Sequence, residues 1–169
     1  MATTYEPIST YTVTGSNLLG STGVTFSSIP STYTDLILVY SGKLTAAAIT
    51  LLRVNGDTAS NYSSTIIGGN GSGSATSTKQ SGAATQWLSS YGHQNGNQGN
   101  IVVHLFNYSN TTTYKTNLFK SNNPGGLGID EGIGLWRSTA AINSVNIYLD
   151  RAEYYLVGSM FTLYGIKAA

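Results

Sequence analysis

Charge and cysteine are what this 169-residue sequence has least of. Charged residues make up 9% of the chain, with 8 Lys and Arg against 7 Asp and Glu, so the formal net charge is +1. An average soluble domain contains roughly 25% charged residues. The near-neutral balance argues against nucleic-acid binding, which depends on a basic surplus. The absence of cysteine excludes disulfides and thiolate metal sites.

Long apolar runs and helical patterns are also missing. The longest apolar stretches, such as Leu36 to Tyr40, span about five residues, whereas a membrane-spanning helix needs roughly 20. The segment from Met1 to Pro7 has no basic region followed by an apolar one, which predicts no secretory signal. Helix-forming residues gather only around Ala46 to Ala48, too few for a stable helix. We therefore expect no membrane association and no helical domain.

Hydroxyl, amide and glycine residues take the place of the missing charges. The chain contains 21 Ser, 22 Thr, 14 Asn and 20 Gly, together with 12 Tyr, and 40% of its residues are hydrophobic. That hydrophobicity combined with so little net charge argues against intrinsic disorder. Thr and Tyr favour pleated strands, while Gly, Asn and Ser interrupt helices. The composition therefore predicts an all-β protein.

Short apolar segments separated by turn residues predict the fold class more closely. Thr34 to Tyr40 is apolar on both faces, as expected of a central strand. Asn55-Gly56-Asp57 is a strong hairpin signal, which pairs Ile49 to Val54 with Tyr62 to Ile67. Turn signals roughly every 10 to 20 residues favour an antiparallel, jelly-roll-like β-sandwich over a fold with crossover helices. Further strands are expected at Val24 to Phe26, Trp87 to Tyr91, Ile101 to Phe106, Tyr114 to Lys120, Ala141 to Leu149 and Met160 to Ile166.

The length of the chain fits one domain with a tail. Residues 1–20 are polar and rich in Thr, which predicts an extended N-terminal arm, and residues 21–169 form a single β-sandwich domain in this interpretation. Within the domain, Gly68 to Thr85 and Gly92 to Asn100 are rich in Gly, Ser and Asn and are expected to be long loops. The candidate assembly residues of the arm are Tyr5, Tyr11, Leu18 and Leu19.

The few ionisable residues form no recognisable catalytic or metal-binding motif. Asp130 and Glu131 are adjacent, so on a strand they point to opposite faces, unlike the paired carboxylates of a glycosidase. His93 and His104 are 11 residues apart, a spacing that matches no common zinc motif. No Gly-x-Ser-x-Gly elbow precedes a helix. We therefore predict that the protein is not an enzyme and uses no cofactor or metal.

Aromatic residues in or beside polar loops are the candidates for a contact surface. Tyr and Trp supply rigid contact area at a small cost in conformational entropy. Their rings suit stacking on the sugars of a glycan, but they suit equally well packing against a neighbouring subunit or the protein's own core, and the sequence leaves these alternatives open. The residues concerned are Tyr62, Trp87, Tyr91, Tyr108 and Tyr114.

Four segments follow one another in an unusual order along the chain: Phe26 to Leu36, Leu52 to Tyr62, Phe106-Asn107-Tyr108 with Lys115, and Gly158 to Ile166. In this order they resemble the small β-sandwich virion structural proteins of tailed bacteriophages. The resemblance covers most of the chain from about residue 24 onwards, and it depends on the order of short motifs. It implies one β-sandwich domain, of a kind found alone or at the ends of longer tail fibres, located at the virion surface.

Two functions fit this resemblance. The first is a capsid decoration or cement protein, expected to be a homotrimer, that stabilises the head through symmetric contacts with the major capsid protein or other virion proteins. A near-neutral hydroxyl surface suits such crowding because it avoids like-charge repulsion between neighbours. The alternative is a tail-fibre or tail-tip module whose loops bind a glycan of the host surface.

Overall fold

The structure, a computed structural model, describes residues 4–71, 73–89, 97–124 and 128–167. These residues form β-strands and irregular connections and contain no helix, so none of them forms a helix able to cross a membrane. The strands are β1 (Tyr5–Thr12), β2 (Leu18–Leu19), β3 (Val24–Phe26), β4 (Asp35–Gly42), β5 (Thr50–Val54), β6 (Tyr62–Gly69), β7 (Thr76–Ala83), β8 (Gln86–Trp87), β9 (Gly99–Leu105), β10 (Lys115–Asn123), β11 (Gly128–Trp136), β12 (Val145–Leu149), β13 (Tyr154–Tyr155) and β14 (Met160–Ile166).

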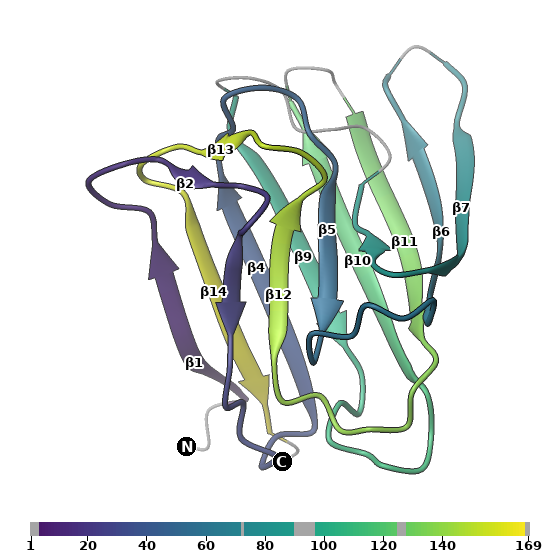
Figure 1. Ribbon diagram of the computed structural model, residues 1–169. Helices are drawn as coiled ribbons and strands as arrows, with labels where there is room; N and C mark the ends of the chain where they lie inside the picture. The colour runs from purple at the N-terminus through teal and green to yellow at the C-terminus, as the bar shows by residue number, and fades with distance from the viewer. Residues whose placement is uncertain (1–3, 72, 90–96, 125–127, 168–169) are drawn as a thin grey trace.

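Two antiparallel sheets pack face to face. The larger has eight strands in the order β1-β14-β4-β9-β10-β11-β6-β7, and the smaller has four in the order β3-β12-β5-β8. Figure 1 shows the smaller sheet lying in front of the larger one, with β13 and β2 at one end of the sandwich. The predicted all-β, antiparallel, jelly-roll-like sandwich is thereby confirmed.

Alternating burial along the strands explains how the sequence selects this arrangement. On β4, Leu36, Leu38 and Tyr40 are buried against the smaller sheet, and the residues between them face outward. On β12, Val145 and Ile147 face the larger sheet from the other side. Side chains with a period of two therefore fill the space between the two layers, as expected for a sandwich.

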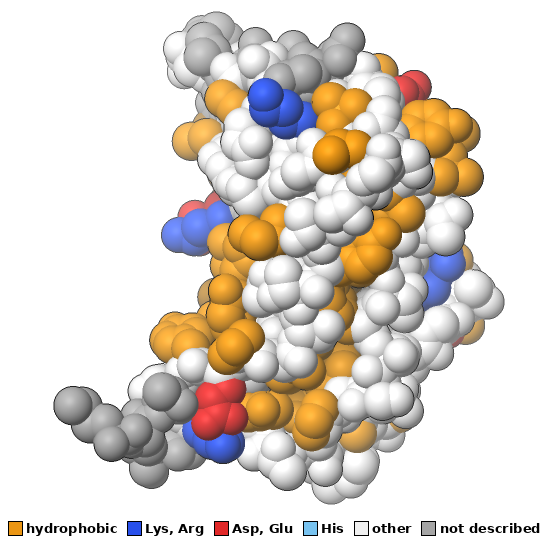
Figure 2. Space-filling view, turned by 90° about the vertical axis from the view of Figure 1, so that its left-hand side faces the viewer, with side chains coloured by type: hydrophobic (Ala, Val, Ile, Leu, Met, Phe, Trp, Pro, Cys, Tyr) orange, Lys and Arg blue, Asp and Glu red, His pale blue; other side chains and the backbone are white. Residues whose placement is uncertain are grey.

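The expected N-terminal arm is instead part of the domain, and that prediction was wrong. Residues Tyr5–Thr12 form β1, which pairs with β14 from Tyr5↔Ile166 to Thr12↔Met160 and so closes one edge of the eight-stranded sheet. The pattern was misleading because an edge strand that is exposed along most of its length has no need for apolar alternation. Figure 2, which views the molecule from this edge, shows hydrophobic side chains among uncharged polar ones, with charged side chains in small isolated groups.

The segment Gly68 to Thr85 was expected to be a loop, but it contains the whole of β7 and the last two residues of β6. β6 continues to Gly69, and β7 pairs with it from Gly68↔Thr76 to Tyr62↔Ala83, forming the other edge of the large sheet. The second expected loop, Gly92 to Asn100, lies partly outside the described residues, and its last two residues begin β9.

The Asn55-Gly56 turn is present, but it joins two sheets and not two paired strands. Asn55 and Gly56 adopt φ angles of 51° and 64°, in the left-handed region that Asn and Gly tolerate best. The preceding strand β5 pairs with β12 and β8, whereas the following strand β6 pairs with β11 and β7. The predicted hairpin between them is therefore wrong, because the turn carries the chain from one layer to the other.

Candidate interaction surface on the eight-stranded sheet

The outer face of the eight-stranded sheet carries a group of exposed aliphatic side chains. They come from four neighbouring strands, β6, β11, β10 and β9, and each stands at the position that alternation turns away from the core. Ile129, Ile67 and Ile133 have exposed fractions of 65%, 61% and 59%, which is high for isoleucine in a strand. We call this group the outer-face patch; its members are Ile67, Val102, Leu118, Ile129 and Ile133.

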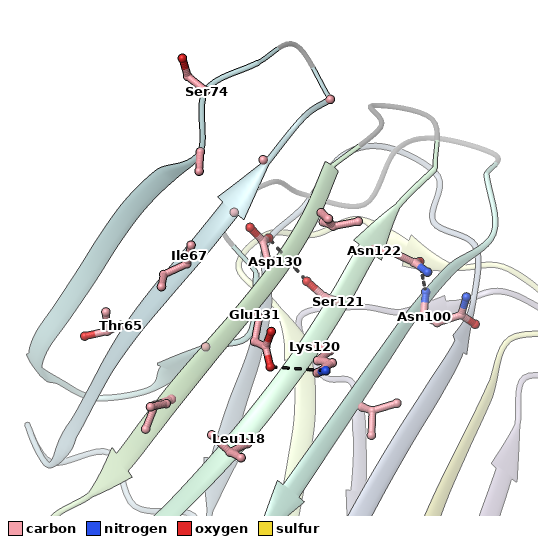
Figure 3. Close-up of a pocket in the computed structure, with 18 of the residues that line it drawn as sticks. Thr65, Ile67, Ser74, Asn100, Leu118, Lys120, Ser121, Asn122, Asp130 and Glu131 are labelled. Carbon is pink, nitrogen blue, oxygen red and sulfur yellow. Dashed lines mark hydrogen bonds and ion pairs between the residues drawn. The ribbon is translucent and has the colours of Figure 1, made fainter.

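The outer-face patch lines a hollow of about 1050 Å³. The connection between β6 and β7 borders the hollow at one end, and Figure 3 shows Ser74 on this connection above the sheet. The neighbouring lining residues Gly71 and Gly73 are small, so the border is formed largely by backbone. Among the described residues, the lining contains no aromatic side chain on which a sugar ring could stack.

One ion pair crosses the middle of the outer-face patch. Lys120 on β10 and Glu131 on β11 are direct cross-strand neighbours, and Lys120 Nζ lies 3.4 Å from Glu131 Oε1 (Figure 3). Their side chains are 74% and 64% exposed, so in the isolated chain the pair contributes at most about 1 kcal/mol to folding. Its charges are nevertheless the only ones lining the hollow besides buried Asp130, among the residues that the structure describes.

Asp130 and Glu131 point to opposite faces of β11, as the sequence predicted. Asp130 is buried on the core side, where Ser121 Oγ donates to its Oδ2 across 3.5 Å. Glu131 faces solvent on the outer side. The two carboxylates are thus separated by the sheet itself and do not form a catalytic pair.

The aromatic candidates divide by burial, and two of them were wrong. Tyr62 and Tyr108 are fully buried and belong to the core. The Tyr62 hydroxyl accepts from the Val54 backbone N–H at 3.1 Å, and burial raises the pKa of Tyr62 to about 12. The Tyr108 hydroxyl donates to the Pro30 carbonyl. Tyr62 begins β6 and Tyr108 lies in the turn after β9, so polar neighbours in sequence hide the fact that both side chains face inward.

Of the remaining aromatic candidates, the structure describes Trp87 and Tyr114, and it does not bring these two together into one site. Tyr114 is 56% exposed just before β10, at the end of the sandwich. Trp87 is partly buried on β8, where it stands opposite Leu51 on the outer side of the smaller sheet. Tyr91 lies outside the described residues.

The four residues assigned to the arm have ordinary places in the sandwich. The ring of Tyr11 packs against Phe161 at a centroid distance of 6.4 Å, and Tyr5 stands exposed opposite Ile166. Leu18 and Leu19 form β2 and pair with β13. These contacts are made within the chain.

The residues that carry the phage resemblance hold loops in place. The Asn55 side chain donates to the Ala141 carbonyl at 2.8 Å and accepts from the Asn143 N–H at 2.8 Å. Buried Lys115 donates to two backbone carbonyls, those of Thr113 at 2.7 Å and Thr139 at 3.1 Å, and burial lowers its pKa. Asn55 and Lys115 therefore tie neighbouring loops together.

His104 and Asp35 form the only histidine–carboxylate pair among the described residues. Their Nε2 and Oδ2 atoms lie 3.0 Å apart, and Asp35 Oδ1 also accepts from the Asn107 N–H at 2.6 Å. No hydroxyl of the described residues is hydrogen-bonded to His104, so the pair lacks the nucleophile of a triad. His93 lies outside the described residues, and within them no group of three metal-ligating side chains occurs.

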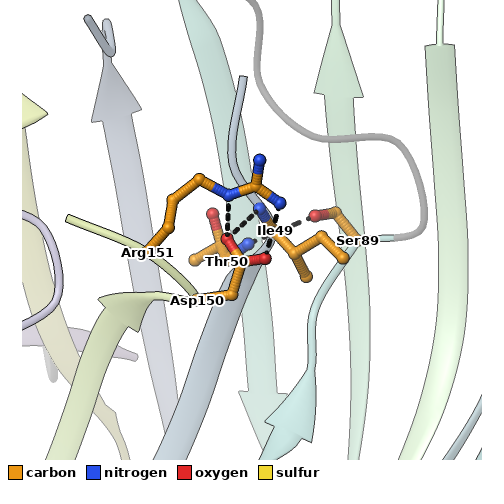
Figure 4. Close-up of polar contacts among 5 residues, drawn as sticks. All are labelled: Ile49, Thr50, Ser89, Asp150 and Arg151. Atoms are coloured by element: carbon orange, nitrogen blue, oxygen red, sulfur yellow. Dashed lines mark hydrogen bonds and ion pairs between the residues drawn. The ribbon is translucent and has the colours of Figure 1, made fainter. Parts of the chain in front are cut away.

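Asp150 joins the end of β12 to the start of β5 (Figure 4). Its Oδ1 accepts from the Ile49 N–H at 2.9 Å, and the Arg151 guanidinium binds both carboxylate oxygens, at 3.0 and 2.8 Å. The hydrogen bond from Arg151 is the main reason that the pKa of Asp150 is lowered. Next to it, Ser89 Oγ accepts from the Thr50 N–H at 3.4 Å. This cluster therefore ties the end of β12 to the start of β5.

Sequence reasoning missed the outer-face patch, although β11 carried a signal for it. In Gly128-Ile129-Asp130-Glu131-Gly132-Ile133-Gly134, glycines and isoleucines alternate over part of the strand. Phe119 fills the space over Gly132 and Gln86 the space over Gly134, so the glycines occupy the core face and the isoleucines face outward. The alternation of glycine with isoleucine along β11 is therefore the sequence feature that indicates this exposed aliphatic face.

Fold and surface together define a two-sheet β-sandwich with an apolar outer face. No protein-family model and no curated protein matches the sequence. Among solved structures, galectin LEC-6 of Caenorhabditis elegans is similar with a TM-score of 0.36 and 10% identity, over 86% of this chain and 93% of the galectin. A mutant of alginate lyase Aly36B is similar with a TM-score of 0.37 and 11% identity, over 96% of this chain and 88% of the lyase. These likenesses concern the fold and carry no argument about function.

Proposed function

We propose that the protein is a structural component of a bacteriophage virion, a capsid decoration or cement protein located at the virion surface. The observation that supports this proposal best is the outer-face patch. Contiguous exposed aliphatic surface on a soluble domain marks a protein-interaction site. The sequence resemblance to phage virion proteins supplies the setting in which such an interaction would be used.

The chemistry of the patch favours a protein surface as its partner. Aliphatic side chains gain from removal from water, at roughly 25 cal/mol per Å² of apolar area. They offer no stacking platform and few hydrogen-bonding groups, which a glycan would need. The low overall charge also suits an assembly in which many copies lie close together.

The proposal predicts many copies of the protein on purified virions and a loss of attachment when the patch is charged. Quantitative mass spectrometry should give a copy number comparable to that of the major capsid protein. Ile133→Glu should reduce attachment to heads at least ~10-fold, because it places a carboxylate in the apolar protein contact, with the capsid or with another copy of this chain, that holds the protein on the head. Val157→Glu, at an exposed aliphatic residue outside the patch, serves as the matched control. A handful of copies per virion, or equal attachment of both variants, would contradict the proposal.

Trp87 supports a second candidate function, a tail-fibre or tail-tip module that binds a host glycan. Its partly buried ring stands on the outer side of the smaller sheet near Tyr148, over whose ring the Arg53 guanidinium lies at 4.9 Å from the centroid. On this hypothesis, Trp87→Ala should abolish binding on a glycan array, whereas Tyr114→Ala, which removes an exposed ring elsewhere, should not. Absence of any glycan signal from the unmodified protein would end this alternative.

A further inference from the structure

The register of the large sheet shows that the outer-face patch has an internal symmetry. One row of outward-facing side chains crosses four strands in the order Ile67, Glu131, Lys120, Val102. Read from either end, this row is aliphatic, charged, charged, aliphatic, and the two charges have opposite sign. The next row crosses the same strands in the order Thr65, Ile133, Leu118, His104, with its two aliphatic residues again in the middle.

A symmetric row of this kind matches a rotated copy of itself. Consider a two-fold axis that lies in the plane of the interface, parallel to the strands and midway between β10 and β11. Rotation about this axis places Lys120 of one copy over Glu131 of the other, and Glu131 over Lys120. It places Ile67 over Val102 in the same row. In the second row, Ile133 and Leu118 face each other across the two copies.

We propose that the outer-face patch binds a second copy of this chain, forming a two-fold symmetric homodimer in which the large sheets pack face to face. This inference deepens the proposed structural function and rests on it by naming the partner of the same surface. A two-fold interface uses one patch on both subunits, so the patch must be complementary to itself. The row through Lys120 and Glu131 meets this condition in residue pattern and in charge, and the row through Ile133 and Leu118 places apolar residues over each other.

The exposed ion pair explains why a second copy fits better than an unrelated apolar surface. Covering Lys120 and Glu131 with aliphatic groups would remove both charges from water without new partners, which is costly. A second copy supplies each of them with an opposite charge, which turns one pair into a network of four. A two-fold axis perpendicular to the strands would instead place Lys120 over Lys120 and Glu131 over Glu131. The charges therefore also determine how the two copies are oriented.

The available area agrees with a stable contact. About this axis the overlap spans six strands, β4, β9 and β10 on one side and β11, β6 and β7 on the other. At about 4.8 Å between strands and about 3.4 Å per residue, six strands of roughly seven residues present close to 700 Å². Stable protein interfaces bury about 800 Å² on each partner. The small residues Gly71 and Gly73 at the border of the hollow leave room for the opposing side chains.

Charge reversal in two separate variants tests the dimer. The unmodified chain should have twice its 17.8 kDa mass by analytical ultracentrifugation, across a concentration series. Lys120→Glu makes both central residues acidic, and Glu131→Lys makes both basic, so each variant alone should be monomeric, with association weakened roughly 100-fold. An equimolar mixture of the two should restore dimers, because every acidic residue then faces a lysine. Rescue between two different chains is not expected if the pair acts only within one chain.

The outcomes separate this inference from the proposed function. Lys167→Glu reverses an exposed charge just after β14, outside the six overlapping strands, and should leave the dimer intact. A monomeric or trimeric unmodified chain, or failure of the mixture to associate while both variants retain their β-sheet circular dichroism, would overturn the dimer. Abundant copies on virions together with such a result would leave the decoration role standing. A dimer in solution together with absence of the protein from virions would support the dimer and overturn the decoration role.

Discussion

Replacing Gly134 with alanine is expected to lower the free energy of unfolding by roughly 3 kcal/mol. A Cβ atom at this position would lie 2.2 Å from Gln86 Nε2 and 2.3 Å from its Oε1. The Gln86 amide has no free space to move into, because it is buried and exchanges two hydrogen bonds with the Asn117 amide, at 2.9 and 2.8 Å. The substitution must therefore break a buried amide pair that joins the two sheets.

Thermal unfolding followed by circular dichroism measures this effect. In a domain of this size, each kcal/mol shifts the midpoint by about 2–4 °C, so a decrease of roughly 10 °C is expected. Gly69→Ala is the matched control, because it also lies in a strand of the large sheet and its Cβ would have no neighbour within 4 Å. Similar midpoints for the two variants would show that the Gln86–Asn117 pair can rearrange at little cost.

Removal of the Asp57 carboxylate should be at least as damaging, at about 3 kcal/mol for Asp57→Ala. Three donors converge on this carboxylate: the Ala59 N–H at 2.8 Å, the Asn61 amide at 2.8 Å and the Trp136 indole N–H at 2.7 Å. Trp136 is buried, so its N–H would lose its partner where water has little access. Urea unfolding should show the loss, while Thr58→Ala, at an exposed neighbour in the same turn, should change little.

The same carboxylate gives the stability a defined dependence on pH. Burial alone raises the pKa of Asp57, but the hydrogen bonds from Asn61, Trp136 and Ala59 outweigh it and hold the pKa below its ordinary value of 3.8. A pKa lowered by folding contributes stability that is present above 3.8 and is lost as the pH falls through the folded-state value. The gap in unfolding free energy between the unmodified chain and Asp57→Asn should therefore narrow in acid. A gap that stays constant down to full protonation would contradict this assignment.

The central part of the fold could be predicted from sequence, and its edges could not. Strands such as β4 and β9 lie between other strands and bury one face against the smaller sheet, so they contain runs of apolar residues that are visible in the sequence. β1 and β7 form the two edges of the large sheet and are largely exposed, so their sequences are polar and resemble an arm and a loop. The pattern of apolar residues in a sequence reflects which side chains are buried, and edge strands bury few of theirs.

The contact surface was harder to predict for a related reason. The sequence shows that Ile66 and Ile67 are both apolar, but it does not show which of the two faces the core. Which of the two faces the core depends on how β6 pairs with β11. On β11, Phe119 and Gln86 occupy the space over Gly132 and Gly134 on the core face. The aromatic residues were predicted as contacts because rings are common in binding loops, but Tyr62 and Tyr108 are buried in the core.

The pairing of the first and last long strands has a mechanical consequence. β1 begins and β14 ends at the same end of the large sheet, where Tyr5 stands opposite Ile166 and the Lys167 N–H donates to the Thr4 carbonyl at 3.1 Å. Tension applied between the two termini would load this ladder one rung at a time, beginning at Tyr5, and would not pull all its hydrogen bonds at once. The domain should therefore unfold easily under a force that pulls its two termini apart. A force applied perpendicular to the sheet would not break the hydrogen bonds between β1 and β14 in this way.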